Sequence, residues 1–480
     1  MAVLLILVIT GYVIRTKLVI VPLIALWALV LSGPYLIYAD SLPIYNDQLG
    51  FVSEVLSGIL YGHVEVVQGE LSSLGHAYFT SMLTQLAGIN PPIWGPVFVQ
   101  MLLPFAYALP LLTLPYRDAR EIAIVMLIVL GAVLNPILYG RTPFAWSYLV
   151  LFAVFLYNRL NGVEALDVVA TITIVIIYAA YVISDPTSLI IPIVLTTLTI
   201  FRRKFFPLAL MTAVIWVAIN LILYISGSLY SILVQIMALI ESPTNPLPSL
   251  VAPAANPVMK LYGYLREFTV LITFSIGLAA SSIMLGDVLR GRDETGSASG
   301  WIALYSLFIF MQIIALAMNR WGMVPYSMYS ISLLPILILA LIRRVKLLQL
   351  AALILAIILV ALSPVVKWGF SAIAFPTIND LHEASFITRY VDGGKTCASG
   401  AHQLLEFYYR LYNVSSPIYY LDPIFTPSQS NNCDLTAVFY RAFNIYRLGI
   451  TIEYLSNELK AMDNTFNVVY KNGFWTIWSK

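Results

Sequence analysis

The stretch of the sequence best suited to chemistry is acidic and lies between two apolar runs. It contains no lysine or arginine from residue 40 to residue 92. Its carboxylates are those of Asp40, Asp47, Glu54, Glu65 and Glu70. A carboxylate held at a fixed position can accept a proton as a general base. An acid in the first turn of a helix can instead stabilise the helix dipole by about 0.3–1 kcal/mol, with no further role. The secondary structure that holds these acids therefore decides which of the two roles each acid can have.

Two amphipathic helices are expected to hold the acidic stretch. The first begins after Asn46, a favourable N-cap, so that Asp47 falls in its first turn. The second lies within residues 70–88, and both carry apolar residues at helical spacing. These residues are Leu49, Val52, Val55, Leu56, Ile59 and Leu60 in the first helix, and Leu71, Leu74, Tyr78, Leu83 and Leu86 in the second. Such helices lie along a membrane surface. His63 and His76 are either site residues or plain residues of these helices.

The composition predicts a polytopic helical membrane protein. Hydrophobic residues make up 60% of the 480 residues, charged residues only 10%, and the mean hydropathy is +0.87. A soluble domain could not cover so much apolar surface. The net charge is +2, and the cations stand at the ends of apolar runs instead of in one strip. This distribution excludes a nucleic-acid-binding surface.

About eleven transmembrane helices are predicted. A helix of roughly 20 apolar residues crosses the hydrocarbon core of a bilayer. Windows of about this length lie near residues 18–38, 94–115, 121–139, 144–158, 166–184, 187–201, 205–226, 267–289, 300–318, 325–342 and 347–366.

The distribution of cations gives these spans an orientation. Short loops rich in lysine and arginine stay in the cytoplasm. Alternate loops carry Arg15, Lys17, Arg117, Arg120, Arg159, Arg202, Arg203, Lys204, Arg290, Arg292, Arg343, Arg344 and Lys346. The opposite loops carry only Arg141, Lys260, Arg266 and Arg320. We therefore expect a cytoplasmic N-terminus and an extracytoplasmic C-terminal segment, with the cell membrane as the location.

Two domains follow from this topology. Residues 1–366 are the predicted transmembrane domain, with a first outer loop at 39–93, and residues 367–480 are a predicted extracytoplasmic α/β domain. Within the second domain, Asn472-Gly473 stands between two β-rich runs and is typical of a hairpin turn. Cys397 and Cys433 are the only cysteines of the chain, and an oxidising exterior favours a disulfide between them over two free thiols.

The whole-chain pattern resembles the GT-C class of integral membrane glycosyltransferases. The residues that carry the resemblance are YNDQLGFVSEVLSGILYGH from Tyr45, ELSSLGHAYFTSMLTQLAGI from Glu70, SDPTS at 184–188, NRWGMVPYSMYSISLLPILILA at 319–340 and the closing VVYKNGFWTIW. The WWDYG signature of oligosaccharyltransferases is absent from the sequence. The resemblance therefore implies a single-sugar donor instead of a preassembled oligosaccharide.

The resemblance also implies a reaction and roles for individual residues. The donor would be a sugar on a polyprenyl or dolichyl phosphate, and the acceptor a glycan, a lipid or a protein. Asp47 would be the general base of an inverting displacement, with Asp40 and then Glu54 as alternatives. Arg320, or else Arg141, would hold the donor phosphate through a charge-assisted contact.

Other positions differ from the family pattern or carry less specific expectations. The family often has a histidine where this chain has Asp185, and its paired acidic motif is reduced here to Asn46-Asp47. Lys260 and Arg266 belong to a proline-rich segment that would either fold over a bound donor or serve as a plain connection. No cofactor is firmly implied; a divalent metal is compatible with the pattern but nothing in the sequence indicates one.

Two other classes of protein compete with this interpretation. A transporter or lipid flippase would also be polytopic, but such proteins place ionisable residues at the bilayer midplane and show internal repeats. The predicted spans are nearly free of charge and show no obvious repeat. An accessory subunit that keeps the fold and lacks catalysis is the second alternative.

Overall fold

The structure is a computed structural model of the whole chain. It describes residues 46–62, 74–89, 94–133, 141–161, 168–201, 203–225, 324–344, 347–368, 384–389, 394–399, 418–420, 432–439, 460–471 and 475–479, together with helical residues between 265 and 286. For some of these residues, including 46–51 and 141–143, the description covers the backbone alone.

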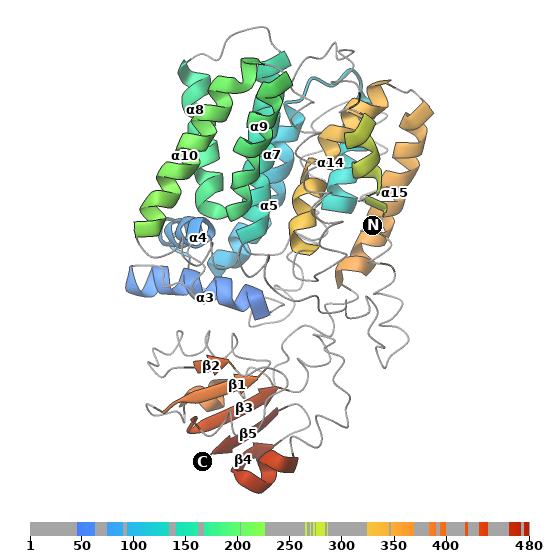
Figure 1. Cartoon of the computed structure of the whole chain (residues 1–480). Coiled ribbons are helices and arrows are strands. Elements are labelled where there is room, and N and C mark those ends of the chain that lie inside the picture. Colours follow the sequence, from blue (N-terminus) through green and yellow to red (C-terminus); the bar gives the residue numbers. More distant parts are fainter. Residues whose placement is uncertain are drawn as a thin grey trace.

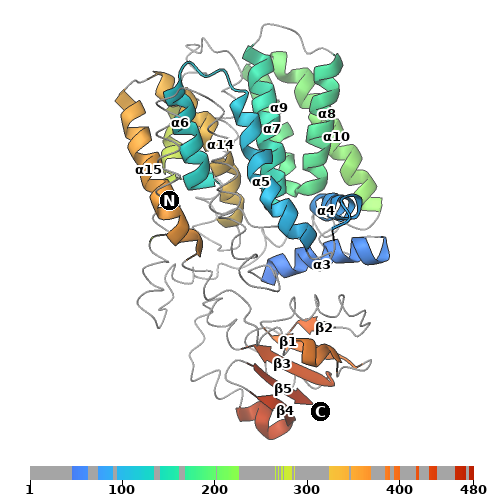
Figure 2. The same ribbon diagram turned by 180° about the vertical axis from the view of Figure 1, so that it is seen from behind.

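The described helices form two adjoining groups (Figures 1 and 2). The first group comprises α5 (Trp94–Leu112), α7 (Arg141–Asn161), α8 (Val168–Ser184), α9 (Ile190–Phe201) and α10 (Phe206–Ile225). The second comprises α6 (Ala119–Ile128), its π-helical continuation Val129–Val133, α14 (Val324–Arg344) and α15 (Leu347–Trp368). Helix α14 packs against both α6 and α7 and so joins the groups. Short 3-10 helices, Pro186–Leu189 and Arg203–Phe205, precede α9 and α10.

Two further helices lie across one end of the bundle, below α8 and α10 in Figure 1. They are α3 (Asn46–Tyr61) and α4 (Leu74–Leu86), which pack against each other. Both helices of the acidic stretch are thus present. Helix α4 also contacts α5, α7 and α8, so it anchors this pair to the bundle.

Eight of the predicted spans coincide with described helices. They are the windows at 94–115, 121–139, 144–158, 166–184, 187–201, 205–226, 325–342 and 347–366. The windows at 18–38 and 300–318 lie outside the described residues, and the window at 267–289 is described only in pieces, all of them helical. The total of eleven spans and their orientation stay predictions.

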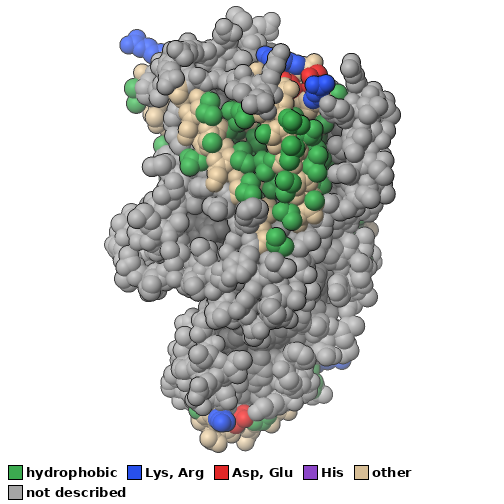
Figure 3. Space-filling view, turned by 90° about the vertical axis from the view of Figure 1, so that its right-hand side faces the viewer, with side chains coloured by type: hydrophobic (Ala, Val, Ile, Leu, Met, Phe, Trp, Pro, Cys, Tyr) green, Lys and Arg blue, Asp and Glu red, His purple; other side chains and the backbone are tan. Residues whose placement is uncertain are grey.

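Apolar side chains cover the outside of the bundle. Helix α15 exposes Leu350, Ile354, Ile357 and Ile358, which recur at helical spacing on one face. Figure 3 shows a hydrophobic surface on this side of the molecule, with charged groups above it. By length and composition, one described helix, Trp94–Leu112, could cross a membrane by itself, and six shorter apolar helices accompany it. An apolar exterior of this kind suits contact with lipid.

The connection between α5 and α6 is fixed by polar contacts at the start of α6. Asp118 is the N-cap, and its Oδ1 accepts hydrogen bonds from the backbone N–H groups of Arg120 and Glu121 at 2.9 and 3.0 Å. The Tyr116 hydroxyl donates to the carbonyl of Leu111 at 2.7 Å. Burial raises the pKa of Tyr116 above its ordinary value, with a smaller opposite effect from Arg343, so the phenol keeps its proton even in basic solution.

The C-terminal residues form a five-stranded mixed sheet in the order β2-β1-β3-β5-β4. The strands are β1 (Thr396–Ser399), β2 (Ile418–Tyr420), β3 (Leu435–Phe439), β4 (Asn467–Lys471) and β5 (Trp475–Ser479). Strands β2, β1 and β3 are parallel, whereas β5 runs antiparallel to β3 and β4. The antiparallel β4–β5 pair confirms the predicted hairpin, whose turn residues 472–474 lie outside the described residues. The sheet lies at the end of the bundle that carries α3 (Figure 1).

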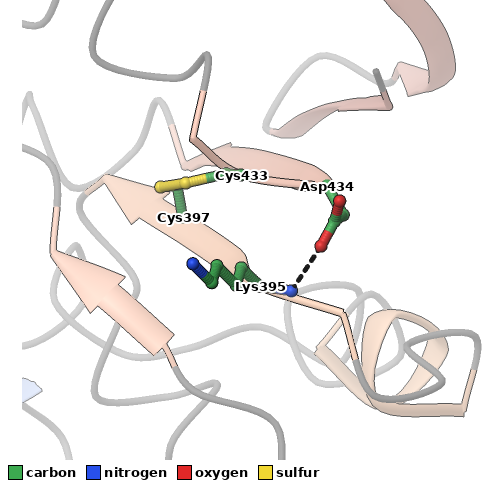
Figure 4. Close-up of a disulfide and its surroundings, with 4 residues drawn as sticks. All are labelled: Lys395, Cys397, Cys433 and Asp434. Atoms are coloured by element: carbon green, nitrogen blue, oxygen red, sulfur yellow. Dashed lines mark hydrogen bonds between the residues drawn. A yellow bond between two sulfur atoms is a disulfide. The ribbon is translucent and has the colours of Figure 1, made fainter.

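A disulfide joins Cys397 in β1 to Cys433, just before β3, with 5.8 Å between their Cα atoms (Figure 4). Both cysteines are buried. Beside it, the backbone N–H of Lys395 donates to Oδ2 of Asp434 at 2.7 Å. Two neighbouring parallel strands are therefore tied together at the same end by a covalent bond and a hydrogen bond.

Candidate active site

Helix α3 begins at Asn46 itself, so this residue is the first of the helix instead of its N-cap, and position 47 lies in the first turn as predicted. Its buried side includes Val52, Val55 and Leu56 from the predicted apolar stripe. Two features differ from the expectation: Leu60 is half exposed, and Glu54 is buried with the stripe instead of lying away from it. The buried side of α3 is thus partly ionisable.

Glu54 is paired with a histidine of the neighbouring helix. Nε2 of His76 in α4 lies 3.3 Å from Oε2 of Glu54, within ion-pair distance but without the geometry of a hydrogen bond. The exposed fractions are 2% for Glu54 and 0% for His76, so the contact is closed to bulk solvent. A buried carboxylate is costly unless a partner compensates it. This contact is the polar centre of the α3–α4 packing.

Helix α4 turns part of its predicted apolar stripe outward. Tyr78 is 45% and Leu86 is 82% exposed, whereas Leu83 is partly buried against the core. The buried positions are instead His76, Ala77, Thr80, Ser81 and Thr84. The small and polar side chains of α4 therefore face protein. Most of the large apolar ones face outward, where lipid can cover them.

Close packing fixes both ends of α4. A Cβ added at Gly75 would lie 2.5 Å from Oγ of Ser184, at the end of α8. A Cβ added at Gly95, in the first turn of α5, would overlap Thr84. Neither glycine has room for a side chain, so the sequence needs glycine at both crossings. Helix α4 is held against α8 at its start and against α5 at its end.

The aromatic ring of Phe144 extends this packing to α7. Its centroid lies 6.3 Å from that of His76 and 5.6 Å from that of Phe79, the second pair being edge-to-face. Phe144 follows three residues after Arg141, the first residue of α7. The start of α7 therefore lies against α4, beside the Glu54–His76 contact.

The SDPTS segment at 184–188 begins at the last residue of α8, close to the place where α8 packs against α4. Asp185 follows α8 directly and is fully buried. Its N–H donates to the carbonyl of Tyr181, and its own carbonyl accepts from Ser188 N–H at 3.2 Å. The Tyr178 hydroxyl donates to the carbonyl of Ser188 at 3.0 Å. These bonds hold the turn between α8 and the following 3-10 helix against the bundle.

The structure thus gathers several of the predicted site residues at one corner. Glu54, Asp185, the first turn of α3 with position 47, and the start of α7 with position 141 belong to elements that pack on α4 or adjoin it. For Asp47 and Arg141 the description covers the backbone alone. The remaining candidates, Asp40, His63, Lys260, Arg266 and Arg320, lie outside the described residues. Among the described residues, no group of three or more histidine, cysteine or acidic side chains could hold a metal ion.

Comparison with solved structures identifies the architecture. ArnT from Cupriavidus metallidurans, in a crystal structure bound to undecaprenyl phosphate, matches with a TM-score of 0.59 over 97% of this chain and 98% of ArnT, at 12% sequence identity. The chain shares the ArnT fold. The apo state of ArnT gives a TM-score of 0.57 over 98% of both chains, also at 12% identity. No protein-family model and no curated protein matches the sequence.

The ArnT fold confirms the GT-C resemblance at the level of architecture. It is the fold of a multi-pass membrane protein, in agreement with the composition of the chain. At 12% identity the likeness shows the fold alone, so the roles of individual residues depend on the geometry of this chain.

The structure gives His76 a more central position than the sequence indicated. His76 was expected to be either a site residue or a plain interfacial one; it lies at the centre of the packed corner. One signal could have found it: His76, Thr80 and Thr84 recur every four residues and mark a polar, packed side of α4. A different signal concerns α3: positions 47 and 54 are seven residues apart, so they share one face of that helix.

Proposed function

We propose that the protein is a membrane glycosyltransferase that transfers one sugar from a polyprenyl-phosphate carrier to an acceptor at the extracytoplasmic face. The observation that carries the proposal is the ArnT fold over nearly the whole of both chains, because ArnT is a GT-C glycosyltransferase whose solved structure holds undecaprenyl phosphate. A polyprenyl phosphate is the lipid partner that this likeness favours. The identity of the sugar and the class of the acceptor, whether a glycan, a lipid or a protein, are for the assay to establish.

The position of α3 and α4 suits a donor that cannot leave the bilayer. Both helices lie across the end of the bundle, and α4 turns Tyr78, Phe79, Met82 and Leu86 outward. Helices with an apolar outer side settle at the interface of lipid and water. A polyprenyl tail would remain in the lipid beside them, while the phosphate and sugar reach the polar end of the bundle.

The reaction is a single displacement at the anomeric carbon. Asp47 accepts the proton of the acceptor hydroxyl as its oxygen forms the new glycosidic bond. The bond from the anomeric carbon to the phosphate oxygen breaks, and its electron pair leaves with the polyprenyl phosphate. The configuration at the anomeric carbon is inverted. Asp40 is the alternative base.

The leaving group needs a cation more than a proton, because polyprenyl phosphate is already anionic. Arg320 is our first choice for this cation and Arg141 the second, since both are among the few cations on the predicted outer side. The start of α7 at Arg141 packs beside the Glu54–His76 contact, which favours a role for this arginine close to α3. Lys260 and Arg266 would assist from the proline-rich loop that precedes residue 267.

The experiment is a transfer assay with purified protein in liposomes and a panel of polyprenyl- and dolichyl-phosphate sugars. A transferase consumes one donor and releases the lipid phosphate in the presence of an acceptor extract. A flippase would move the intact donor between leaflets without cleaving it. An accessory subunit would do neither alone, and full donor recovery with every sugar would contradict the proposal.

A further inference from the structure

The buried Glu54–His76 contact has no role in the proposed reaction, so its purpose needs another explanation. Both side chains are ionisable, both are buried, and 3.3 Å separates Nε2 from Oε2. Burying such a pair gives little net stability compared with apolar residues of the same size. The best-attested use of a buried polar pair is to fix how two elements register against each other. Because Glu54 lies on α3 and His76 on α4, this pair can fix how α3 is rotated against α4.

Helix geometry links the pair to position 47. Seven residues separate Asp47 and Glu54 in the continuous helix α3. This spacing is close to two turns, so the two positions lie on one face, about 10.5 Å apart along the axis. Rotating α3 by one residue would turn both positions by about 100°. A contact that holds position 54 against α4 therefore also sets the direction of position 47.

The α4 side of the contact is itself held by α8 and α7. Gly75 packs directly on Ser184 of α8, and the ring of Phe144 in α7 lies 6.3 Å from that of His76. The Ser81 hydroxyl lies between two carbonyl oxygens, 2.7 Å from that of Ala77 in α4 and 3.0 Å from that of Val55 in α3, and it can donate to one of them at a time. A backbone carbonyl limits sliding of α3, but it does not select a helix face. The buried apolar residues Val52, Val55 and Leu56 help to select that face, and the Glu54–His76 contact adds a constraint between two defined side-chain atoms on it.

We propose that Glu54 and His76 are positioning residues: their contact sets the rotation of α3 on α4 and thereby aims Asp47 at the reacting centre. The inference rests on the proposed function for the part that concerns catalysis. It also removes Glu54 from the set of alternative bases, because its carboxylate is turned into the α3–α4 packing. Glu54 acts through Asp47 and does not touch the substrate.

The first test measures the direction of position 47 without any activity. Asp47→Cys provides a unique thiol, since Cys397 and Cys433 are joined to each other. The rate at which a membrane-impermeant methanethiosulfonate modifies this thiol is measured in liposomes. We expect Glu54→Gln or His76→Gln to change the rate by about twofold or more, as contacting residues couple to that extent. The double Gln variant should show no larger change than the stronger single variant.

Ser81→Ala is the matched control, because it removes a neutral polar contact between α3 and α4 and leaves the pair intact. An equal change in the Ser81→Ala protein would show that general packing, not the pair, orients position 47, and would overturn the proposal. An unchanged rate in all pair variants would overturn it as well. If a single variant fails to fold, the neutral double Gln variant gives the same comparison.

The second test measures transfer. Misplacement of a reacting group lowers turnover by up to about a hundredfold, so Glu54→Gln should lower kcat within that limit and leave the KM for the donor nearly unchanged. A complete loss of turnover with an unchanged thiol rate would make Glu54 a chemical participant and refute positioning. If no donor is ever cleaved, the proposed function fails, while the thiol rates still decide whether the pair orients α3.

Discussion

Arg343 and Glu121 form a two-point ion pair although 222 residues separate them in the chain. Nε of Arg343 lies 3.0 Å from Oε1 of Glu121, and Nη2 lies 2.8 Å from Oε2. The same Nη2 also donates to the carbonyl of Pro115, and Glu121 accepts the N–H of Arg117 at 2.9 Å. The pair ties the start of α6 to the last turn of α14, at the bundle end away from α3 and α4 (Figure 2).

Breaking this ion pair should destabilise the bundle. Glu121 is 2% exposed, so Glu121→Gln leaves the Arg343 guanidinium beside a neutral group in a largely buried place. We expect a loss of about 2–4 kcal/mol, toward the lower end for buried pairs because the arginine keeps some contact with solvent. Thermal unfolding of the detergent-solubilised protein measures it. Asp118→Asn is the control, since asparagine caps a helix as well as aspartate does. Equal unfolding temperatures for Glu121→Gln and wild type would contradict the expectation.

The packing of α4 on α8 makes a second prediction. Gly75→Ala places a methyl group 2.5 Å from Ser184 Oγ and 3.2 Å from Ser184 Cα, so backbone must move. Overpacking of this kind costs about 1–3 kcal/mol. Gly286→Ala is the matched control, because an added Cβ there meets nothing within 4 Å. The two variants are compared by thermal unfolding. A Gly75→Ala protein as stable as the Gly286→Ala protein would show that α4 can shift freely on α8.

The outcome at α4 also shows what the sequence could and could not predict. The windows for α5, α7, α8 and α10 were found because the length of an apolar run is a local property that the bilayer itself selects. Which side of α4 meets protein could not be predicted, because an apolar face can meet protein or lipid, and periodicity is the same in both cases. Tyr78 faces outward and His76 inward because α3, α7 and α8 pack on the side of α4 that carries His76.

The site was only partly predictable for a related reason. Asp47 at the start of a helix follows from Asn46 and the apolar spacing after it. The contact of Glu54 with His76 joins two helices, and local patterns carry no information on which side chains face each other across them. Asp185 was singled out by the GT-C resemblance, whereas its complete burial at the end of α8 required the tertiary structure.

The disulfide should stabilise the C-terminal sheet. Cys397 and Cys433 are 36 residues apart, and closing a loop of that length stabilises a fold by about 2–4 kcal/mol. Reduction should therefore lower the unfolding temperature of the full chain and increase proteolysis of the sheet strands. Cys397→Ala with Cys433→Ala should reproduce the reduced protein and lose any further response to reductant. Both thiols reacting freely with an alkylating reagent in the denatured, non-reduced protein would refute the bridge.

The distribution of cations predicts that the segment after residue 366 faces away from the cytoplasm. A membrane-impermeant protease should remove this segment from intact cells or right-side-out vesicles, because only the outer side is exposed there. A tag placed at the C-terminus reports the cleavage, and a cytoplasmic marker protein reports leakage. Cleavage in inverted vesicles alone would reverse the orientation and would move the proposed reaction to the cytoplasmic face.

The last prediction separates catalysis from helix capping at Asp47. Asp47→Asn keeps the size of the side chain but cannot accept a proton, so turnover should fall by roughly a hundred- to ten-thousand-fold while folding and donor binding survive. Capping alone predicts a loss of no more than about 1 kcal/mol in stability, with transfer nearly intact.

Arg320→Ala provides the contrast. A cation that holds the donor phosphate acts in the ground state as well as in the transition state, so its removal should weaken donor binding together with kcat/KM. Binding of a non-hydrolysable polyprenyl-phosphonate sugar measures the first effect and single-turnover transfer the second. Near-normal transfer by Asp47→Asn protein would exclude Asp47 as the base and leave Asp40, since Glu54 is turned into the packing with His76.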